Sequence, residues 1–252
     1  MLKRFLSHLT VVTMLLCLSG VAYNAHAGDD AAIVTMLDGS AQAFTKGAKT
    51  GTRLKKNDQL SKDQEVKVGE KSRIELKFPD GTVMRLSEKS SLKLSDVSYD
   101  QATQGKNVKV NLSVGKLWAN VKKLTTPDSK VEVKTVNAVA GVRGTVYRVN
   151  AEEDNSAQVK VYDGSVYVDG TPKDTSKPVT QSGGPVPVAG PQPVAPPYHE
   201  VSMEEWHVIV KSFQQITISS QGVPSQPQDF TPQQDMDDWV KWNQERDKQL
   251  QL

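Results

Sequence analysis

The chain has 252 residues, with 31 basic and 29 acidic side chains, one cysteine and 6% aromatic residues. This length allows one sizeable domain or two small ones, and the nearly balanced charge excludes the strongly basic surface typical of a nucleic-acid-binding domain. A hydrophobic fraction of 37% is low for a globular chain, which indicates that part of the chain lies outside a packed core.

Residues 1–27 have the pattern of a secretory signal peptide. Lys3 and Arg4 precede an apolar run, LTVVTMLLCL, and the small-x-small sequence AHA occupies residues 25–27. Cleavage after Ala27 would also remove Cys17, so the mature protein would lack disulfides and cysteine metal sites. No later segment has the roughly 20 apolar residues of a membrane span. We therefore expect a periplasmic or secreted protein with no membrane span after cleavage; a retained signal would instead act as an anchor.

Residues 28–170 are predicted to form one β domain. Apolar and polar residues alternate in RIELKF, VKVNLSV and AQVKVYD, and this period of two is typical of antiparallel strands with one buried and one solvated face. Asp-Gly pairs at residues 38–39, 80–81 and 163–164 suit two-residue hairpin turns. The predicted fold is all-β, an antiparallel β roll or distorted sandwich of short strands.

The composition changes after residue 170. Residues 171–198 are rich in proline, which predicts an extended linker, and residues 199–252 are predicted to form a small helical tail. In the sequence VSMEEW, Ser202 and Glu205 fit a capping box, so we expect a helix from there to about Gln215.

A second helix is predicted to begin at Thr231. Pro232 would occupy the first helical position, and Gln234 stands three residues after the cap. Trp239 and Trp242 are three residues apart and would share one face of this helix. Two interpretations of that face are open: it docks on the protein's own β domain, or it contacts a partner.

Four segments of the β region carry a resemblance to a known family. Their order and motifs, above all the stretch AVAGVRGT, resemble a FecR-type domain over roughly residues 60–170. The four segments are SRIELKFPDGTVMRLSEKSSLKL (72–94), VNLSVGKLWANVKKL (110–124), KVEVKTVNAVAGVRGTVYRV (130–149) and AQVKVYDGSVYV (157–168).

The resemblance implies a compact extracytoplasmic β domain and a habit of binding proteins. The best-known members regulate an anti-sigma and sigma-factor pair and relay a signal from an outer-membrane receptor. Here a cleavable signal replaces their cytoplasmic segment and membrane helix, and the linker and helices replace their receptor-contacting domain. We therefore predict a non-enzymatic exported module that binds a protein partner in envelope signalling or assembly.

Arg143 stands between Gly141 and Gly144 in the most specific stretch. A guanidinium there could donate to backbone carbonyls while the glycines allow close backbone approach, which would be a structural role. The alternative is contact with an anion or a partner.

Trp118 is expected to pack in or over the β core. A second functional hypothesis is binding of a glycan or cell-wall polymer, for which Trp118, Tyr147 and Tyr162 are the candidate stacking residues. An exposed row of these side chains would favour that hypothesis.

Signals for catalysis are weak. The sequence has no Gly-x-Ser-x-Gly elbow and no phosphate-binding glycine loop. His199 and His207 lack companion ligands, so neither a metal site nor a cofactor is predicted. We expect no enzyme, and the sequence leaves the oligomeric state open.

Overall fold

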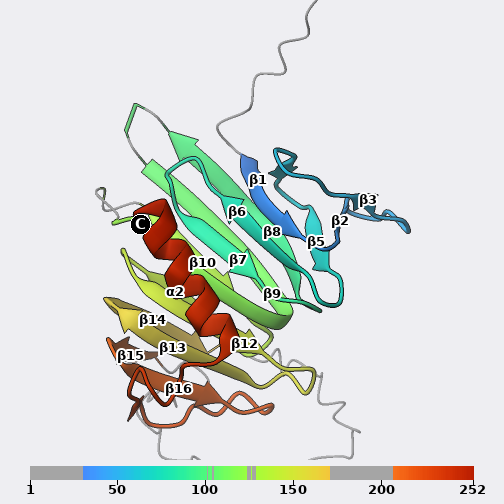
Figure 1. Ribbon diagram of the computed structural model, residues 1–252. Helices are drawn as coiled ribbons and strands as arrows, with labels where there is room; N and C mark the ends of the chain where they lie inside the picture. The colour runs from blue at the N-terminus through green and yellow to red at the C-terminus, as the bar shows by residue number, and fades with distance from the viewer. Residues whose placement is uncertain (1–30, 101, 104, 124–125, 127–128, 171–206) are drawn as a thin grey trace, which may run out of the picture.

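The computed structural model describes residues 31–100, 102–103, 105–123, 126, 129–170 and 207–252 (Figure 1). The predicted signal peptide and the proline-rich linker at 171–198 lie outside these residues. The described chain is a continuous 17-stranded sheet that is covered on one side by the helix α2 (Asp238–Leu250). The predicted all-β class with a C-terminal helix is confirmed.

The strand pairings divide the sheet into two halves that share β9 (Gly105–Asn120). Half A runs, in order of hydrogen-bonded neighbours, β4 (Gln59–Ser61), β1 (Ala31–Asp38), β6 (Arg73–Lys77), β7 (Val83–Leu86), β9, β12 (Val146–Ala151), β13 (Ala157–Asp163), β16 (Gln214–Ile218) and β17 (Gln228–Asp229). Half B runs β3 (Thr52–Arg53), β2 (Ala41–Phe44), β5 (Glu65–Val68), β8 (Ser91–Asp100), β9, β10 (Lys130–Lys134), β11 (Ala138–Val142), β14 (Ser165–Gly170) and β15 (His207–Lys211).

Strand β9 belongs to both halves. Its first part, residues 105–114, pairs with β8 and β10 in half B, and residues 115–120 pair with β7 and β12 in half A. The pairing of β9 with β10 is parallel, an exception to the predicted antiparallel pattern. Because one strand is continuous through both halves, it fixes their relative position.

The core lies between the two halves. The inward residues of the alternating strands, such as Val108, Val110 and Leu112 of β9, are buried and join the inward residues of half A in one hydrophobic cluster. The alternation seen in the sequence therefore identifies the core correctly. Each half keeps a second, outward face.

The Asp-Gly turns do not all close hairpins as predicted. Asp80-Gly81 joins β6 to its partner β7, which confirms one hairpin. Asp38-Gly39 connects β1 of half A to β2 of half B, and Asp163-Gly164 connects β13 of half A to β14 of half B. All three glycines have positive φ, so the same local geometry serves here for a corner between the halves.

The first predicted helix is wrong within the described residues. Residues 207–218 form β15 and β16, which pair with β14 and β13. Val210 is fully buried in half B, and Ile216 and Ile218 are fully buried in half A. The alternation in HVIVK, with its β-branched residues, decides the structure here, and the capping signal upstream does not. This part of the predicted tail therefore extends the sheet.

The second helix begins later than predicted. Thr231 and Gln234 do form the reciprocal cap: the Thr231 amide donates to Gln234 Oε1 at 2.9 Å, and the Gln234 amide donates to Thr231 Oγ1 at 3.3 Å. This cap closes a single turn, after which α2 begins at Asp238 with Asp237 as its N-cap.

We predict that Gly115→Ala destabilises the fold much more than Gly47→Ala. Gly115 lies where β9 passes between the halves, has φ of 102°, and an added Cβ would lie 2.5 Å from Ser90 Cα. Gly47 has φ of 81°, and no atom lies within 4 Å of an added Cβ. The free energy of unfolding that Gly47→Ala loses should therefore reflect backbone strain alone, about 1–2 kcal/mol. Urea unfolding should show that Gly115→Ala lowers the free energy of unfolding by at least about 3 kcal/mol. Equal losses for the two variants would contradict the close packing of β9 on Ser90.

Candidate functional site on the outer faces of the sheet

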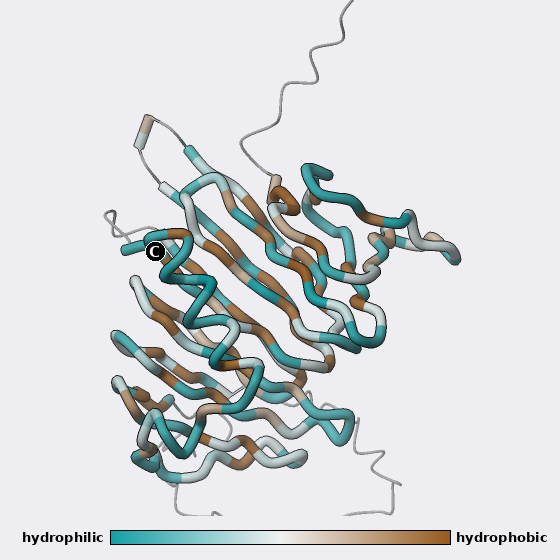
Figure 2. Tube along the Cα trace, viewed as in Figure 1, coloured by the Kyte–Doolittle hydropathy of each residue, from teal (hydrophilic) through white to brown (hydrophobic). Residues whose placement is uncertain are grey.

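The helix α2 lies across the outer face of half A (Figure 1). Its N-cap Asp237 accepts a hydrogen bond from the Val240 amide at 2.7 Å. Figure 2 shows that most of the helix is hydrophilic. Of its residues, only Trp239, Val240 and Asn243 are buried. A polar helix of 13 residues has little stability alone, so its contacts with the sheet hold it in place.

The apolar part of this contact is small and aromatic. Trp118 of β9 and Tyr162 of β13 pack with Phe230, Trp239 and Val240, and the rings of Trp118 and Tyr162 have centroids 4.6 Å apart. The helix thus docks on the protein's own β body, one of the two predicted interpretations.

Trp239 and Trp242 lie on one face of α2, as their spacing predicts. Their rings are stacked with centroids 5.4 Å apart, and the guanidinium of Arg73 lies 5.0 Å from the ring of Trp242. Trp239 is buried, whereas Trp242 is half-buried against the same aromatic cluster.

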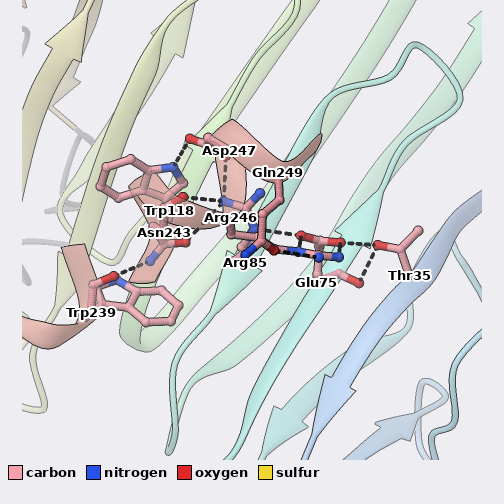
Figure 3. A network of polar contacts seen from close by, with 9 residues as sticks. All are labelled: Thr35, Glu75, Arg85, Trp118, Trp239, Asn243, Arg246, Asp247 and Gln249. Carbon is pink, nitrogen blue, oxygen red and sulfur yellow. Dashed lines mark hydrogen bonds and ion pairs between the residues drawn. The ribbon is translucent and has the colours of Figure 1, made fainter. Parts of the chain in front are cut away.

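A buried ionic network joins α2 to half A (Figure 3). Arg85 of β7 has no exposed surface, and its Nε donates to Glu75 Oε2 of β6 at 2.8 Å. Arg85 Nη1 also donates to Asp247 Oδ1 of the helix at 2.7 Å. Arg246 Nε donates to Glu75 Oε2 at 3.0 Å, and the indole of Trp118 donates to Asp247 Oδ2 at 3.0 Å. Two arginines and two carboxylates are therefore neutralised together.

The network stabilises the charged form of Glu75. Burial by itself would raise the pKa of this carboxyl group, but hydrogen bonds from Arg246, Arg85 and Thr35 outweigh burial and lower the pKa below its ordinary value of 4.5. Thr35 Oγ1 contributes its bond to Glu75 Oε1 at 2.8 Å. Glu75 therefore stays ionised, as its two arginine partners require.

A second ionic cluster holds the segment before the helix. Asp235 Oδ1 accepts from Arg148 Nη2 and from Lys160 Nζ, both at 2.6 Å, and Asp235 Oδ2 accepts from the Tyr162 hydroxyl. Arg148 Nη1 also donates to Asp237 at 3.3 Å. Burial and the bond to Asp235 raise the pKa of Tyr162, so its hydroxyl stays a donor. The C-terminal segment is thus attached by charges at both ends of α2.

The alternation in the sequence fails on this face. It predicts that the outward side chains Glu75, Arg85 and Arg148 are solvated, yet all three are buried beneath the C-terminal segment. The sequence signal for this contact is two arginines on strands that are otherwise mostly apolar, together with Asp247 and Arg246 on a polar helix. The signal could not be read without knowing which strands are neighbours.

The outer face of half B is exposed around β11, β14 and β15. Tyr167 is 53% exposed and its register partner Ile209 is 43% exposed, so the two form a small apolar patch. Gly141 pairs with Tyr167 on the other side. Beside them is a hollow of about 300 Å³, whose lining includes Lys130 and Arg143.

Arg143, which the sequence places between Gly141 and Gly144, lies at this hollow. Arg143 is exposed. A guanidinium that donates to buried carbonyls would be expected to be buried itself, and this burial is not observed. Gly141 lines the hollow and has room for a Cβ, which would lie 4.0 Å from the Tyr167 carbonyl oxygen. Gly144 has φ of 92°, and its Cβ would lie 2.8 Å from Lys123 Cα, so glycine is needed there for the backbone. The choice between a structural and a partner role for Arg143 stays a prediction.

The three aromatic residues proposed to stack on a glycan are buried. Trp118 and Tyr147 have no exposed surface, and Tyr162 lies under the C-terminal segment. They form no exposed row, so the structure does not support the glycan hypothesis. Within the described residues, no group of three or more histidine, cysteine or acidic side chains could hold a metal ion. In the same part of the chain, no helix is long and apolar enough to span a membrane.

We predict that the stability contributed by Glu75 disappears in acid. Its pKa is lowered by folding, so its contribution is complete above 4.5, the ordinary glutamate pKa, and is lost as the pH falls through the lower value of the folded protein. Glu75→Gln should lower the free energy of unfolding by about 3 kcal/mol at pH 7, because Arg246 and part of Arg85 lose their partner. The difference from wild type should shrink steadily below pH 4.5 in urea unfolding.

The matched control is Glu70→Gln, which removes an exposed carboxylate paired with Lys89. That variant should differ little from wild type at any pH. If the difference in unfolding free energy between Glu75→Gln and wild type stayed constant from pH 7 to pH 3, the ionised network would be ruled out.

Comparison with known proteins relates part of the sheet to a known family. Among curated proteins there is no significant match. Two crystal structures of a candidate anti-sigma factor from Parabacteroides distasonis ATCC 8503, at 1.65 and 2.50 Å resolution, are similar to the chain at 18% identity with TM-scores of 0.43 and 0.44. In both, the similarity covers 67% of this chain and 61% of the solved chain. The family model described as FecR protein matches residues 64–167. This segment, from the start of β5 into β14, therefore belongs to the FecR family that the sequence motifs indicated.

Proposed function

We propose that this protein is a non-enzymatic, exported FecR-type module that binds a protein partner in envelope signalling or assembly. The observation that carries the proposal is the exposed patch of Tyr167 and Ile209 on half B, beside the hollow at Gly141. An aromatic and an aliphatic side chain next to a concave surface are typical of a protein-binding site. The FecR match of residues 64–167, which include Gly141 and Tyr167 but not Ile209, supports a role in envelope signalling.

The charges around the hollow indicate what kind of surface the partner presents. Lys130 and Arg143 line the hollow, and Lys211 is the register partner of its lining residue Ser165. Glu132 is the one carboxylate among the described lining residues, and it lies 3.7 Å from Lys109. We therefore propose a partner segment that carries carboxylates toward these cations and an apolar side chain toward Tyr167.

The signal-peptide pattern at residues 1–27 supports the proposed compartment. Export would place this patch in the periplasm or outside the cell, where an envelope protein could reach it. We keep cleavage after Ala27 as part of the proposal.

The test is cross-linked capture from the envelopes of the producing cell with three versions of the protein. We expect wild type to retain a specific protein, and Tyr167→Glu to lose at least about 90% of it, because the new carboxylate would replace the ring that packs on the partner's apolar side chain and would repel the partner's carboxylates. The matched control is Val223→Glu, since Val223 is 63% exposed and lies in the loop after β16. Equal capture by all three versions, or equal loss from both variants, would contradict partner binding through half B.

A further inference from the structure

We propose that the outer face of half A is a binding site for an amphipathic helix, which α2 occupies until a helix of a partner protein displaces it. This site is separate from the half B patch, and the inference does not depend on the proposed function.

The first argument is the chemistry of the covered face. The side chains beneath the C-terminal segment include Glu75, Arg85, Arg148 and Lys160, whereas the apolar core lies on the other side of the same strands. Removing the helix would expose the rings of Trp118 and Tyr162 together with charges that water can solvate, and it would leave the main core covered by half B. A face that is always covered would gain more stability from apolar side chains, because ion pairs lose much of their attraction to desolvation.

The second argument is how α2 is connected. The segment after β17 has no strand of its own, since residues 230–252 contribute only a turn and the helix to the fold. Its departure would leave every strand pairing of the two halves in place. The sheet residues that α2 itself contacts, from Arg73 to Tyr162, lie within the FecR-matched segment 64–167, and the helix lies outside it. Phe230, which precedes the helix, also contacts Phe213 outside that segment. The match is thus to the sheet face.

The third argument is that the fit of α2 is incomplete. Within the part of the chain that the structure describes, three buried donors at this contact have no acceptor: Arg85 Nη2, Arg148 Nε and Trp239 Nε1. Two of the three belong to the sheet, and each unsatisfied donor weakens the contact. A helix that supplied acceptors to those two arginine atoms would bind this face more tightly than α2 does.

The contacts of α2 define the partner helix. It needs an aromatic residue at the place of Trp239, which belongs to the same buried cluster as Trp118. Seven and eight positions later it needs a cation for Glu75 and a carboxylate for Arg85, the roles of Arg246 and Asp247. A helix with this pattern and an additional acceptor toward Arg148 is the expected ligand.

The experiment uses the full-length protein and a fluorescent peptide of residues 230–252, with binding followed by anisotropy. In wild type the peptide competes with α2 and should bind weakly. In Trp239→Ala protein the protein's own helix is weakened while the sheet face is intact, so the wild-type peptide should bind at least about 10-fold more tightly. Arg246→Gln, at the rim of the contact, should give a smaller increase in peptide affinity. This variant replaces Trp239→Ala in the experiment if Trp239→Ala fails to fold.

Two variant peptides test the specificity of the site. An Asp247→Asn peptide should bind at least about 10-fold more weakly than the wild-type peptide, because it loses its charge pair with Arg85. A Lys241→Gln peptide is the matched control and should bind like wild type, since Lys241 is exposed. Tyr167→Glu in the protein should leave peptide binding unchanged, which separates this result from the half B test. Equal binding to wild-type and helix-weakened proteins, or an unaffected Asp247→Asn peptide, would overturn the proposal.

Discussion

The buried guanidinium of Arg85 is the interaction on which the arrangement of the C-terminal segment depends. A cation with no exposed surface must be neutralised locally, and here one carboxylate comes from the neighbouring strand and the other from the helix, at 2.8 and 2.7 Å. Arg246 of the helix pairs in turn with Glu75, so seating α2 adds two further ion pairs to the Arg85–Glu75 pair of the sheet. The position of the helix is therefore set by charge pairing, and its small aromatic contact adds the apolar part of the stabilisation.

The shared strand β9 explains why the two outer faces differ. The strand passes from half B to half A at Gly115, so one continuous element supports both faces and the core between them. On half A, β9 presents Trp118 to the helix; on half B, it presents Lys109 to Glu132. One face is closed by the chain itself, and the other exposes an apolar patch with cations around it. This asymmetry underlies the assignment of partner binding to half B and of helix exchange to half A.

Much of the β body follows from the sequence, because burial repeats with the period of the strand. Alternating residues such as Val108 and Val110 identify the core, and the motifs around Gly141 identify the family. The pattern could not show that Asp163-Gly164 turns a corner, since a positive φ serves a corner as well as a hairpin. It also missed the burial of Arg85 and Arg148, because that burial depends on a helix more than 80 residues away in sequence.

The most direct test of this account is native-state hydrogen exchange of the full-length protein. If charges seat α2 on a sheet that is stable without it, amides in residues 241–250 should exchange through a partial opening, at least about 10-fold faster than the amides of Leu117 and Val149 in β9 and β12. High salt should widen this difference, because it screens partly exposed ion pairs such as that of Arg246 with Glu75 more than it affects the apolar core. Identical opening free energies for the helix and the two strands, unchanged by salt, would contradict the account and make α2 an inseparable part of the fold.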